Sequence, residues 1–119
     1  MLEVWKRSVA LTTELYKLTS RFPDTERYGL TSQIRRAVTS IPANIAEGWG
    51  RGSTGEYVQF LTVAWGSLME VETHLIVACN LHFVSANALA PLSKEIEELG
   101  KMLNALIGAL KARKSGIRD

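Results

Sequence analysis

The sequence contains one cysteine and no long apolar run, and each shortage excludes a class of protein. Cys79 has no second cysteine to pair with, which excludes an intrachain disulfide and favours a reducing compartment such as the cytosol. No stretch approaches the roughly 20 apolar residues that a membrane span requires. Charged side chains within residues 1–7 interrupt the start of the chain before an apolar run of signal-peptide length. We therefore expect a cytoplasmic protein without membrane insertion.

A large excess of charge is also missing. The chain carries 14 Lys and Arg residues against 12 Asp and Glu residues, which gives a formal charge of +2 with both histidines neutral. The hydrophobic fraction of 46% is typical of globular proteins and excludes a disordered chain. A chain of 119 residues is long enough for a core without metal or disulfide support, and we assign residues 1–119 to a single domain.

Apolar residues recur every three or four positions, and the alternation typical of strands is missing. Because the joining segments are only about five to seven residues long, consecutive helices should be antiparallel neighbours. The sequence therefore predicts an all-α protein, an antiparallel up-down-up-down four-helix bundle. The predicted helices cover about residues 2–20, 28–49, 53–80 and 85–110, and a polar tail follows from 111 to 119.

Two prolines and one capping pattern bear on the helix boundaries. Pro42 lies inside the second helix, where we expect a kinked but continuous helix because the apolar register continues through it; two shorter helices are the alternative. Ser53 and Glu56 have the spacing of a capping box at the start of the third helix. The fourth helix should start near a Ser85 cap, although Pro91 leaves its true start open.

The third predicted helix is apolar over about half of its circumference, which is wider than the interior of a bundle requires. Trp65, Met69 and Ile76 form the surplus, and such a patch on a monomer usually marks a contact surface. Glu72 lies inside the same arc, where a carboxylate needs either a donor such as Arg36 or a wet interface. We expect self-association through Trp65, Met69, Glu72 and Ile76; a wider core is the alternative.

Several patterns that could carry chemistry do not meet the requirements of that chemistry. Residues 50–55 match G-x-G-x-x-G, but a dinucleotide fingerprint needs a preceding strand, and here a helix is predicted. Glu70 and His74 are four residues apart, whereas di-iron bundles use Glu-x-x-His. Cys79 has no neighbouring zinc ligands, and Ser67 has no evident catalytic partner beyond His74. The sequence therefore predicts no catalytic residue, no metal and no cofactor.

A polar seam runs along the second helix beside its apolar stripe. It can form hydrogen bonds between helices that fix the register of the bundle or of its subunits, or it can line a groove for a ligand or RNA. The residues of this predicted seam are Gln33, Arg36, Ser40, Asn44 and Glu47.

Basic residues gather near the third helix start and in the C-terminal tail, and they are candidates for contact with nucleic acid. A helix start beside Arg51 can hold a phosphate oxygen, and Arg35 should be solvated on the outer side of the second helix. Terminal cations also suit a helix C-terminus, which is the alternative interpretation. The predicted nucleic-acid-binding residues are Arg35, Arg51, Lys111, Arg113 and Lys114, with Arg118 beyond them.

Most of the chain resembles the four-helix bundle proteins encoded in intervening sequences of bacterial 23S ribosomal RNA genes. The most diagnostic part is the run Ser-Ile-Pro-Ala-Asn-Ile-Ala-Glu-Gly at residues 40–48. That family is also similar to the accessory proteins of diversity-generating retroelements, which assemble as barrel-like pentamers and assist a reverse transcriptase. Further matching residues are Phe22-Pro23, Glu26 to Leu30, Gln33, Arg35 to Ala37, Phe60-Leu61, Ala64, Gly66 to Leu68 and Glu70.

The resemblance implies a small bacterial cytoplasmic protein that is a homopentamer, associates with RNA or another nucleic acid, and has no enzymatic activity. Gln33, Arg36, Asn44 and Glu47 occupy motif positions of the family. Trp65 stands where the family more often has an arginine, which favours hydrophobic contact over anion binding. We therefore expect a non-enzymatic oligomeric scaffold with RNA association. The alternative is an adaptor that presents repeated sites to a partner enzyme such as a reverse transcriptase.

Overall fold

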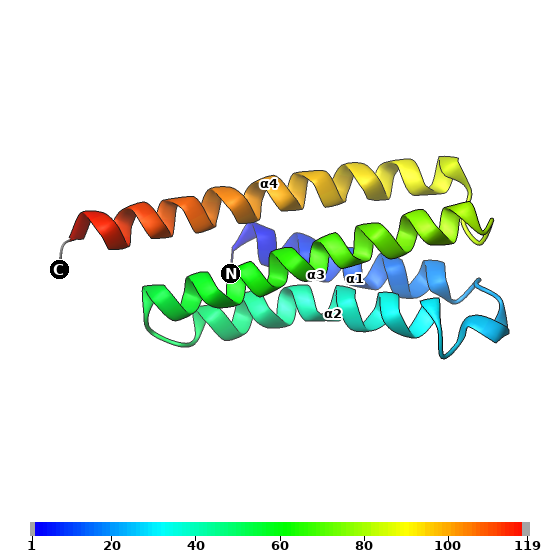
Figure 1. Cartoon of the computed structure of the whole chain (residues 1–119), viewed down its shortest axis with the longest axis horizontal. Helices are drawn as coiled ribbons and strands as arrows, with labels where there is room; N and C mark the ends of the chain where they lie inside the picture. Colours follow the sequence, from blue (N-terminus) through cyan, green and yellow to red (C-terminus); the bar gives the residue numbers. More distant parts are fainter. Residues whose placement is uncertain (1, 118–119) are drawn as a thin grey trace.

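The computed structural model describes residues 2–117 of the chain and the side chains of residues 2–113. These residues form four helices and no strand, which confirms the predicted all-α fold. Consecutive helices lie antiparallel in a bundle that measures 53 × 24 × 21 Å (Figure 1). The elements are α1 (Glu3–Thr19), the short 3-10 helix η1 (Asp24–Glu26), α2 (Leu30–Trp49), α3 (Thr54–Asn80) and α4 (Ala86–Ile117).

The predicted helix starts are close to those observed. The Ser53 Oγ accepts a hydrogen bond from the Glu56 amide at 3.2 Å, and the Ser85 Oγ accepts one from the Ala88 amide at 3.1 Å. The predicted capping box forms only in part, because the Glu56 carboxylate accepts a hydrogen bond from the Ser53 hydroxyl, at 3.1 Å, in place of the Ser53 amide. Pro42 lies inside one continuous α2, so the alternative of two shorter helices does not occur.

The predicted end of the fourth helix is wrong. α4 continues past Leu110 to Ile117, so the described part of the expected polar tail is helical. Residues 111–114 are Lys, Ala, Arg and Lys, all of which favour helix, and no proline follows to stop it. Because α4 has 32 residues and α1 only 17, the C-terminal turns of α4 extend beyond the end of α1 (Figure 1).

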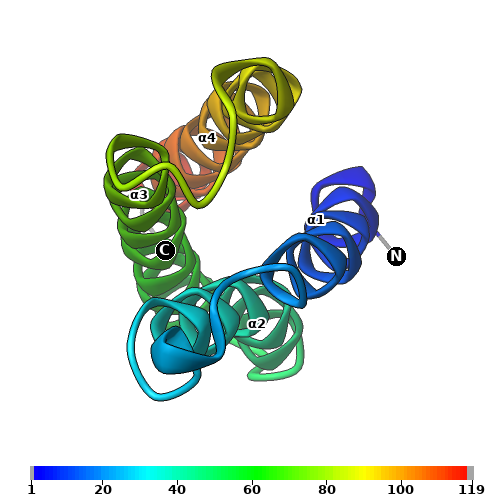
Figure 2. The ribbon, with the colours of Figure 1, turned by 90° about the vertical axis from the view of Figure 1, so that its right-hand side faces the viewer.

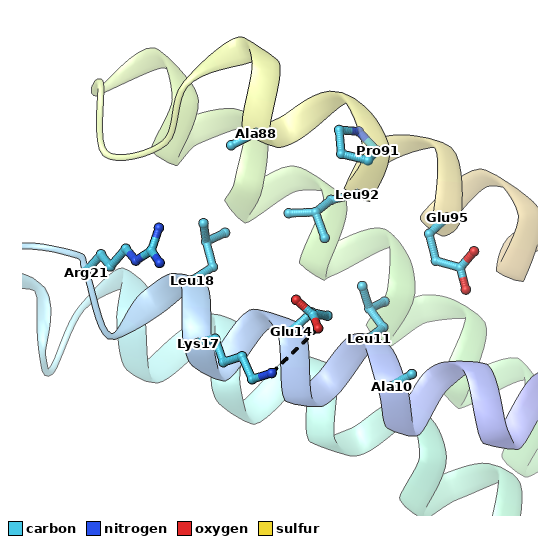
Figure 3. A pocket seen from close by; sticks show the side chains of 10 residues that line it. All are labelled: Ala10, Leu11, Glu14, Lys17, Leu18, Arg21, Ala88, Pro91, Leu92 and Glu95. Carbon is cyan, nitrogen blue, oxygen red and sulfur yellow. Dashed lines mark ion pairs between the residues drawn. The ribbon is translucent and has the colours of Figure 1, made fainter.

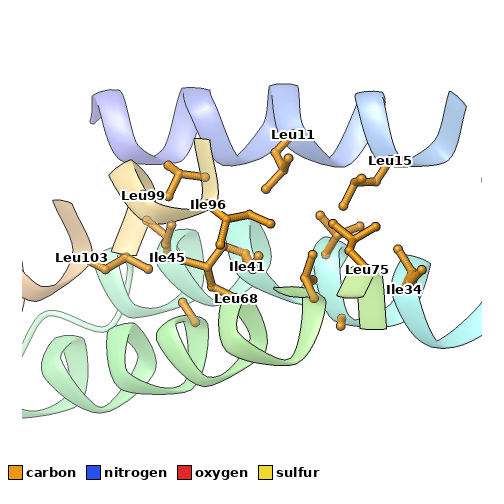
Figure 4. Packing of buried hydrophobic residues seen from close by; sticks show 14 of the residues in the cluster. Leu11, Leu15, Ile34, Ile41, Ile45, Leu68, Leu75, Ile96, Leu99 and Leu103 are labelled. Atoms are coloured by element: carbon orange, nitrogen blue, oxygen red, sulfur yellow. The ribbon is translucent and has the colours of Figure 1, made fainter. Parts of the chain in front are cut away.

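The core consists of aliphatic side chains from all four helices that meet along the bundle axis (Figure 4). Their spacing of three, four or seven residues is that of the predicted apolar stripes. The most deeply buried include Leu15 on α1, Ile34, Ile41 and Ile45 on α2, Leu61, Leu68 and Leu75 on α3, and Ile96, Leu99 and Leu103 on α4. None of the described helices has both the length and the apolar character that a membrane span needs.

The four helices do not pack equally well around this core. Among helices that are neighbours in the bundle, α2 and α3 share the most extensive contact and α1 and α4 share the least. Viewed along the bundle, α1 and α4 are the neighbours that stand apart (Figure 2). A groove of about 520 Å³ runs between them, with Leu11 and Leu18 on one wall and Pro91 and Leu92 on the other (Figure 3).

Candidate functional site

The predicted polar seam on α2 faces α3. The Asn44 amide nitrogen donates to the Ser40 carbonyl at 2.7 Å and to the Ser40 Oγ at 2.8 Å. The Ser40 hydroxyl in turn shares a hydrogen bond of 2.9 Å with the hydroxyl of Ser67 on α3. These three side chains thus pair the two helices in the middle of their contact.

A charged cluster continues the seam toward the start of α2. Arg36 donates to the Gln33 side-chain oxygen at 2.8 Å and forms an ion pair with Glu70 on α3. The Nε2 of His74 lies 3.1 Å from the same carboxylate. The hydrogen bond with His74, together with the charge and hydrogen bond of Arg36, lowers the pKa of Glu70 below its usual range. Glu70 is therefore held in its ionised form between two donors.

This cluster corrects two expectations about single residues. Arg36 does not reach Glu72; it pairs with Glu70, and Glu72 is half-buried on another side of α3. Glu47 does not join the seam, because its carboxylate lies 3.3 Å from the Arg51 Nε at the end of α2. The other four predicted seam residues do lie together, and their hydrogen bonds favour the interpretation that the seam fixes helix register.

Sequence reasoning noted Ser67, Glu70 and His74 on α3 but did not pair them with α2. The signal was present, because Ser67, Glu70 and His74 are spaced three and four apart and so share one helix face. That face lies beside the core stripe of α3, as the predicted seam lies beside that of α2. Two polar stripes that flank two apolar stripes are brought together when the helices pack.

The predicted oligomer surface divides into covered and exposed parts. Trp65 and Met69 are half-buried and pack against the core of their own bundle. Ile76 is 48% exposed, and Val77 and Leu81 extend the exposed apolar surface at the C-terminal end of α3. An exposed apolar surface on α3 therefore exists, but it lies nearer the end of the helix than the prediction placed it.

Arg35 takes a different place from the solvated one that the sequence predicted. Its Nε donates to the Thr19 Oγ1 at 2.9 Å, and a terminal nitrogen donates to the Tyr16 carbonyl at 3.2 Å. The guanidinium carbon also lies 4.6 Å from the centroid of the Tyr16 ring. Arg35 thus fastens α1 to α2. It is 16 residues from Arg51, or about 24 Å along a helix, so it does not join the other predicted basic residues.

Three predicted basic residues lie at the opposite end of the bundle. Arg51 is within 3.9 Å of Glu56 as well as near Glu47, and its guanidinium carbon lies 5.1 Å from the Phe60 ring centroid. Lys111 and Arg113 are exposed on the last described turns of α4, and neither forms an ion pair within the described side chains. The side chains of Lys114 and Arg118 lie outside the described residues.

A cavity of about 320 Å³, which we call the end cavity, lies at this same end. Its lining includes Trp49 from α2, Tyr57 and Thr54 from α3, and Leu106 and Arg113 from α4. The rings of Trp49 and Tyr57 meet edge to face, with centroids 5.9 Å apart. Burial raises the pKa of Tyr57, and its hydroxyl is shielded from water without a hydrogen-bond partner among the described residues.

The other sequence patterns that could have carried chemistry lack the structural context that this chemistry requires. The G-x-G-x-x-G residues 50–55 follow a helix and open α3, so they do not have the strand that a dinucleotide fingerprint requires. Cys79 is partly buried against the core. Within the described part of the chain, no three His, Cys, Asp or Glu side chains gather in a group that could hold a metal ion.

Comparisons with known proteins agree with this architecture. A model of the 23S rRNA-intervening sequence protein family matches residues 1–105. The fold is similar to the crystal structure of a protein of unknown function from the S23 ribosomal protein family of Bacteroides thetaiotaomicron. That similarity has a TM-score of 0.79 and 22% sequence identity, and it covers 87% of this chain and 97% of the other. A comparison with curated proteins gives no match.

Proposed function

Since the chain belongs to the 23S rRNA-intervening sequence protein family, we propose that it is a non-enzymatic oligomeric scaffold that binds RNA at one end of its bundle. The observation that carries the proposal is the charge of α4. Residues 102–117 contain Lys111, Arg113 and Lys114 but no Asp or Glu, whereas Glu95, Glu97 and Glu98 lie earlier on the same helix. Lys111 and Arg113 are therefore the described charges at the extended end of α4, and Arg113 lines the end cavity together with the exposed Trp49.

Assembly would make this small charge effective. A formal charge of +2 on one chain attracts RNA weakly, but several copies with their basic ends together create a stronger local field. The pentamer implied by the family resemblance is one such arrangement. The exposed Ile76, Val77 and Leu81 lie at the other end of α3, so they supply apolar surface for a contact between parallel subunits, which keeps the basic ends on one side of the assembly.

The polar groups that the fold brings together support a structural role more than a catalytic one. Arg36, Glu70 and His74 form hydrogen bonds or ion pairs with one another across α2 and α3. Ser40 and Ser67 do the same nearby. Because these groups already hold each other, we assign them to the scaffold and not to a substrate.

Salt dependence and charge reversal test the RNA proposal. We expect structured RNA to bind with an affinity that falls steeply as salt rises. Lys111→Glu combined with Arg113→Glu should weaken binding and reduce the slope of log affinity against log salt by about 1 for each phosphate that the variant no longer neutralises. The matched control is Lys94→Glu with Lys101→Glu, which makes the same charge change on the same helix and should leave the slope nearly unchanged.

Sedimentation tests the assembly separately. We expect the protein to sediment as an oligomer and Ile76→Glu to shift it toward smaller species. Val9→Glu, which alters a partly exposed valine on α1, is the control and should not change the sedimentation. A monomer at micromolar concentration would contradict the proposed assembly, and an unchanged profile for Ile76→Glu would remove this surface from it.

The groove between α1 and α4 favours a second candidate, an adaptor that binds a partner protein. Its walls are mostly apolar, and Glu14, Lys17, Arg21 and Glu95 add charges around them (Figure 3). Such a groove is of the kind that takes an amphipathic helix. If RNA does not bind, or if its binding does not weaken with salt, the adaptor is the better explanation.

A further inference from the structure

We propose that the end cavity holds one unpaired nucleobase of the bound RNA, with the adjoining phosphate between Arg113 and the start of α3. This inference rests on the proposed function and adds to it a preference for single-stranded or looped RNA. The base of a regular duplex is stacked and paired, and it cannot enter a cavity without being flipped out.

The size and the walls of the cavity suit a planar ring. Its volume of about 320 Å³ lies at the lower end of the range for small-molecule sites. Leu106 and Leu110 from α4 and the Tyr57 ring from α3 provide apolar walls. A nucleobase is largely apolar on its faces and polar at its edges, so such walls can accept its faces.

Trp49 provides a surface on which the base can stack. Its side chain is 59% exposed, although burial of so large an aromatic ring in the core would stabilise the fold. Its contact with the Tyr57 ring, at an interplanar angle of 80°, holds the indole at the cavity without covering it. Exposed aromatic rings beside basic residues are the usual platform for single-stranded nucleic acid.

The side chain of Tyr57, which lines the cavity, ends in a buried polar group without a hydrogen-bond partner among the described residues. The residue is only 9% exposed, and its hydroxyl has no hydrogen-bond partner in the described part of the chain. Leaving a buried hydroxyl unpaired is unfavourable for the fold. The hydroxyl is shielded from water, so a nucleobase edge would reach it only after the surrounding side chains move, and that contact would give it a hydrogen-bond partner.

The phosphate has donors at the mouth of the cavity. Both Thr54 and Arg113 line it, and α3 is a helix of 27 residues that begins at Thr54. Ser53 caps the Glu56 amide, which leaves the first amides of the helix, at Thr54 and Gly55, available to an anion. The nearby Glu56 carboxylate is partly offset, because it accepts a hydrogen bond from Ser53 and lies 3.9 Å from Arg51.

Binding of two RNA probes tests the inference. The probes are a single-stranded RNA of about ten nucleotides and a blunt duplex of the same sequence. We expect the wild-type protein to bind the single strand more tightly. Trp49→Ala should weaken single-strand binding about tenfold and leave duplex binding almost unchanged, and Trp49→Phe should recover part of the loss. Tyr28→Ala is the control, because Tyr28 is 88% exposed at the opposite end.

The outcomes separate this inference from the proposed function. Equal, salt-dependent binding of both probes that Trp49→Ala does not change would overturn the cavity as a base site and keep the basic end as an RNA contact. Failure to bind either probe would overturn both proposals. An equal loss of affinity in Tyr28→Ala and Trp49→Ala would also count against the cavity.

A second variant tests the hydroxyl. Tyr57→Phe removes an unpaired buried polar atom, so we expect a higher melting temperature without ligand. If the hydroxyl contacts the base, the same variant should bind single-stranded RNA several-fold more weakly and duplex RNA equally well. Raised stability with unchanged affinity for both probes would overturn the assignment of the hydroxyl to the site.

Discussion

The contact between α2 and α3 is extensive and polar in part, whereas the contact between α1 and α4 is small and leaves a groove. α2 and α3 join over most of their length and pair polar side chains, including Ser40 with Ser67 and Arg36 with Glu70. α1 and α4 touch little, enclose the apolar groove, and are tied by the side chain of Arg7.

This difference indicates which helix contact has a fixed register and which helix contact can open. Hydrogen bonds between partly buried groups allow only one register of α2 against α3, because a shifted register would leave them unpaired. We expect the side with few contacts between helices to have the lower local stability and to open first. A partner that inserts between α1 and α4 would therefore disturb the bundle least.

The largest expected contrast comes from removing one leucine on each side. Leu75→Ala on α3 should lower the free energy of unfolding by about 2–5 kcal/mol, because the side chain is fully buried and leaves a cavity. Leu92→Ala on α4 should cost only about 1 kcal/mol, because Leu92 is half-buried beside the groove. Urea unfolding of both variants measures the difference. Equal losses would mean that the two sides are packed alike.

Gly48 and Gly66 differ in how closely other atoms surround them. A Cβ at Gly48 would lie 2.8 Å from the Phe60 Cβ and 3.3 Å from the Tyr57 carbonyl oxygen, which are not free to move away. We expect Gly48→Ala to destabilise the fold by about 1–3 kcal/mol in thermal or urea unfolding. Gly66→Ala is the control, because open space surrounds that position on α3 and alanine should stabilise the helix by up to about 1 kcal/mol. A stabilising Gly48→Ala would contradict close packing of α2 on α3.

The side chain of Arg7 links α1 to α4, the two neighbouring helices with the least contact. The Arg7 guanidinium donates to both Glu95 oxygens, at 3.0 and 2.5 Å, and to Glu98 at 2.5 Å, and it lowers the pKa of Glu98. Arg7→Met keeps most of the side-chain volume but removes the charge. Because the pairs are partly exposed, we expect a loss of about 1 kcal/mol in the free energy of unfolding.

Hydrogen exchange should localise the effect of Arg7→Met. The amides of α1 should lose protection, whereas those at the contact of α2 with α3 should keep it. Lys17→Met is the matched control, since Lys17 pairs with Glu14 only at 3.9 Å and both side chains are largely exposed. A uniform loss of protection over the whole bundle would show that α1 does not open separately.

The comparison also explains what the sequence could and could not predict. Helix starts were predictable because caps such as Ser53 act on their own first turn, and the core was predictable because periodicity along one helix selects its buried face. The pairing of Arg36 with Glu70 instead of Glu72 depends on how two helices are rotated against each other, which no local pattern reports. The end of α4 was predicted too early because the apolar periodicity stops at Leu110, although the residues that follow favour helix and include no proline.

The candidate site was the least predictable part for a similar reason. The basic residues at Arg51 and Lys111 are visible in the sequence, but the end cavity is formed where the ends of different helices meet. Whether Trp49 and Arg113 line one cavity depends on the length of α4, since a helix that stopped at Leu110 would not carry Arg113 over the start of α3.

The smallest expected effect is a pH dependence of the free energy of unfolding that arises from Glu70 at the contact of α2 with α3. The folded-state pKa of Glu70 is lowered by His74 and Arg36, so its ionised form stabilises the fold at pH values above the ordinary pKa of an unfolded glutamate. That contribution should disappear as the pH falls through the lower folded pKa. Because the Arg36 side chain is 58% exposed and solvent screens the pair, we expect less than about 1 kcal/mol.

Glu70→Gln should therefore be less stable than the wild-type protein at neutral pH, and the difference should shrink as the solution is made acidic. Urea unfolding at several pH values measures it. Glu97→Gln is the control, because the ion pair of Glu97 with Lys101 at 3.3 Å is exposed on α4 alone and joins no second helix. A constant difference between Glu70→Gln and wild type at every pH would mean that the carboxylate charge does not stabilise the contact of α2 with α3. The register of these helices would then depend on Ser40, Asn44 and Ser67 together with the apolar core.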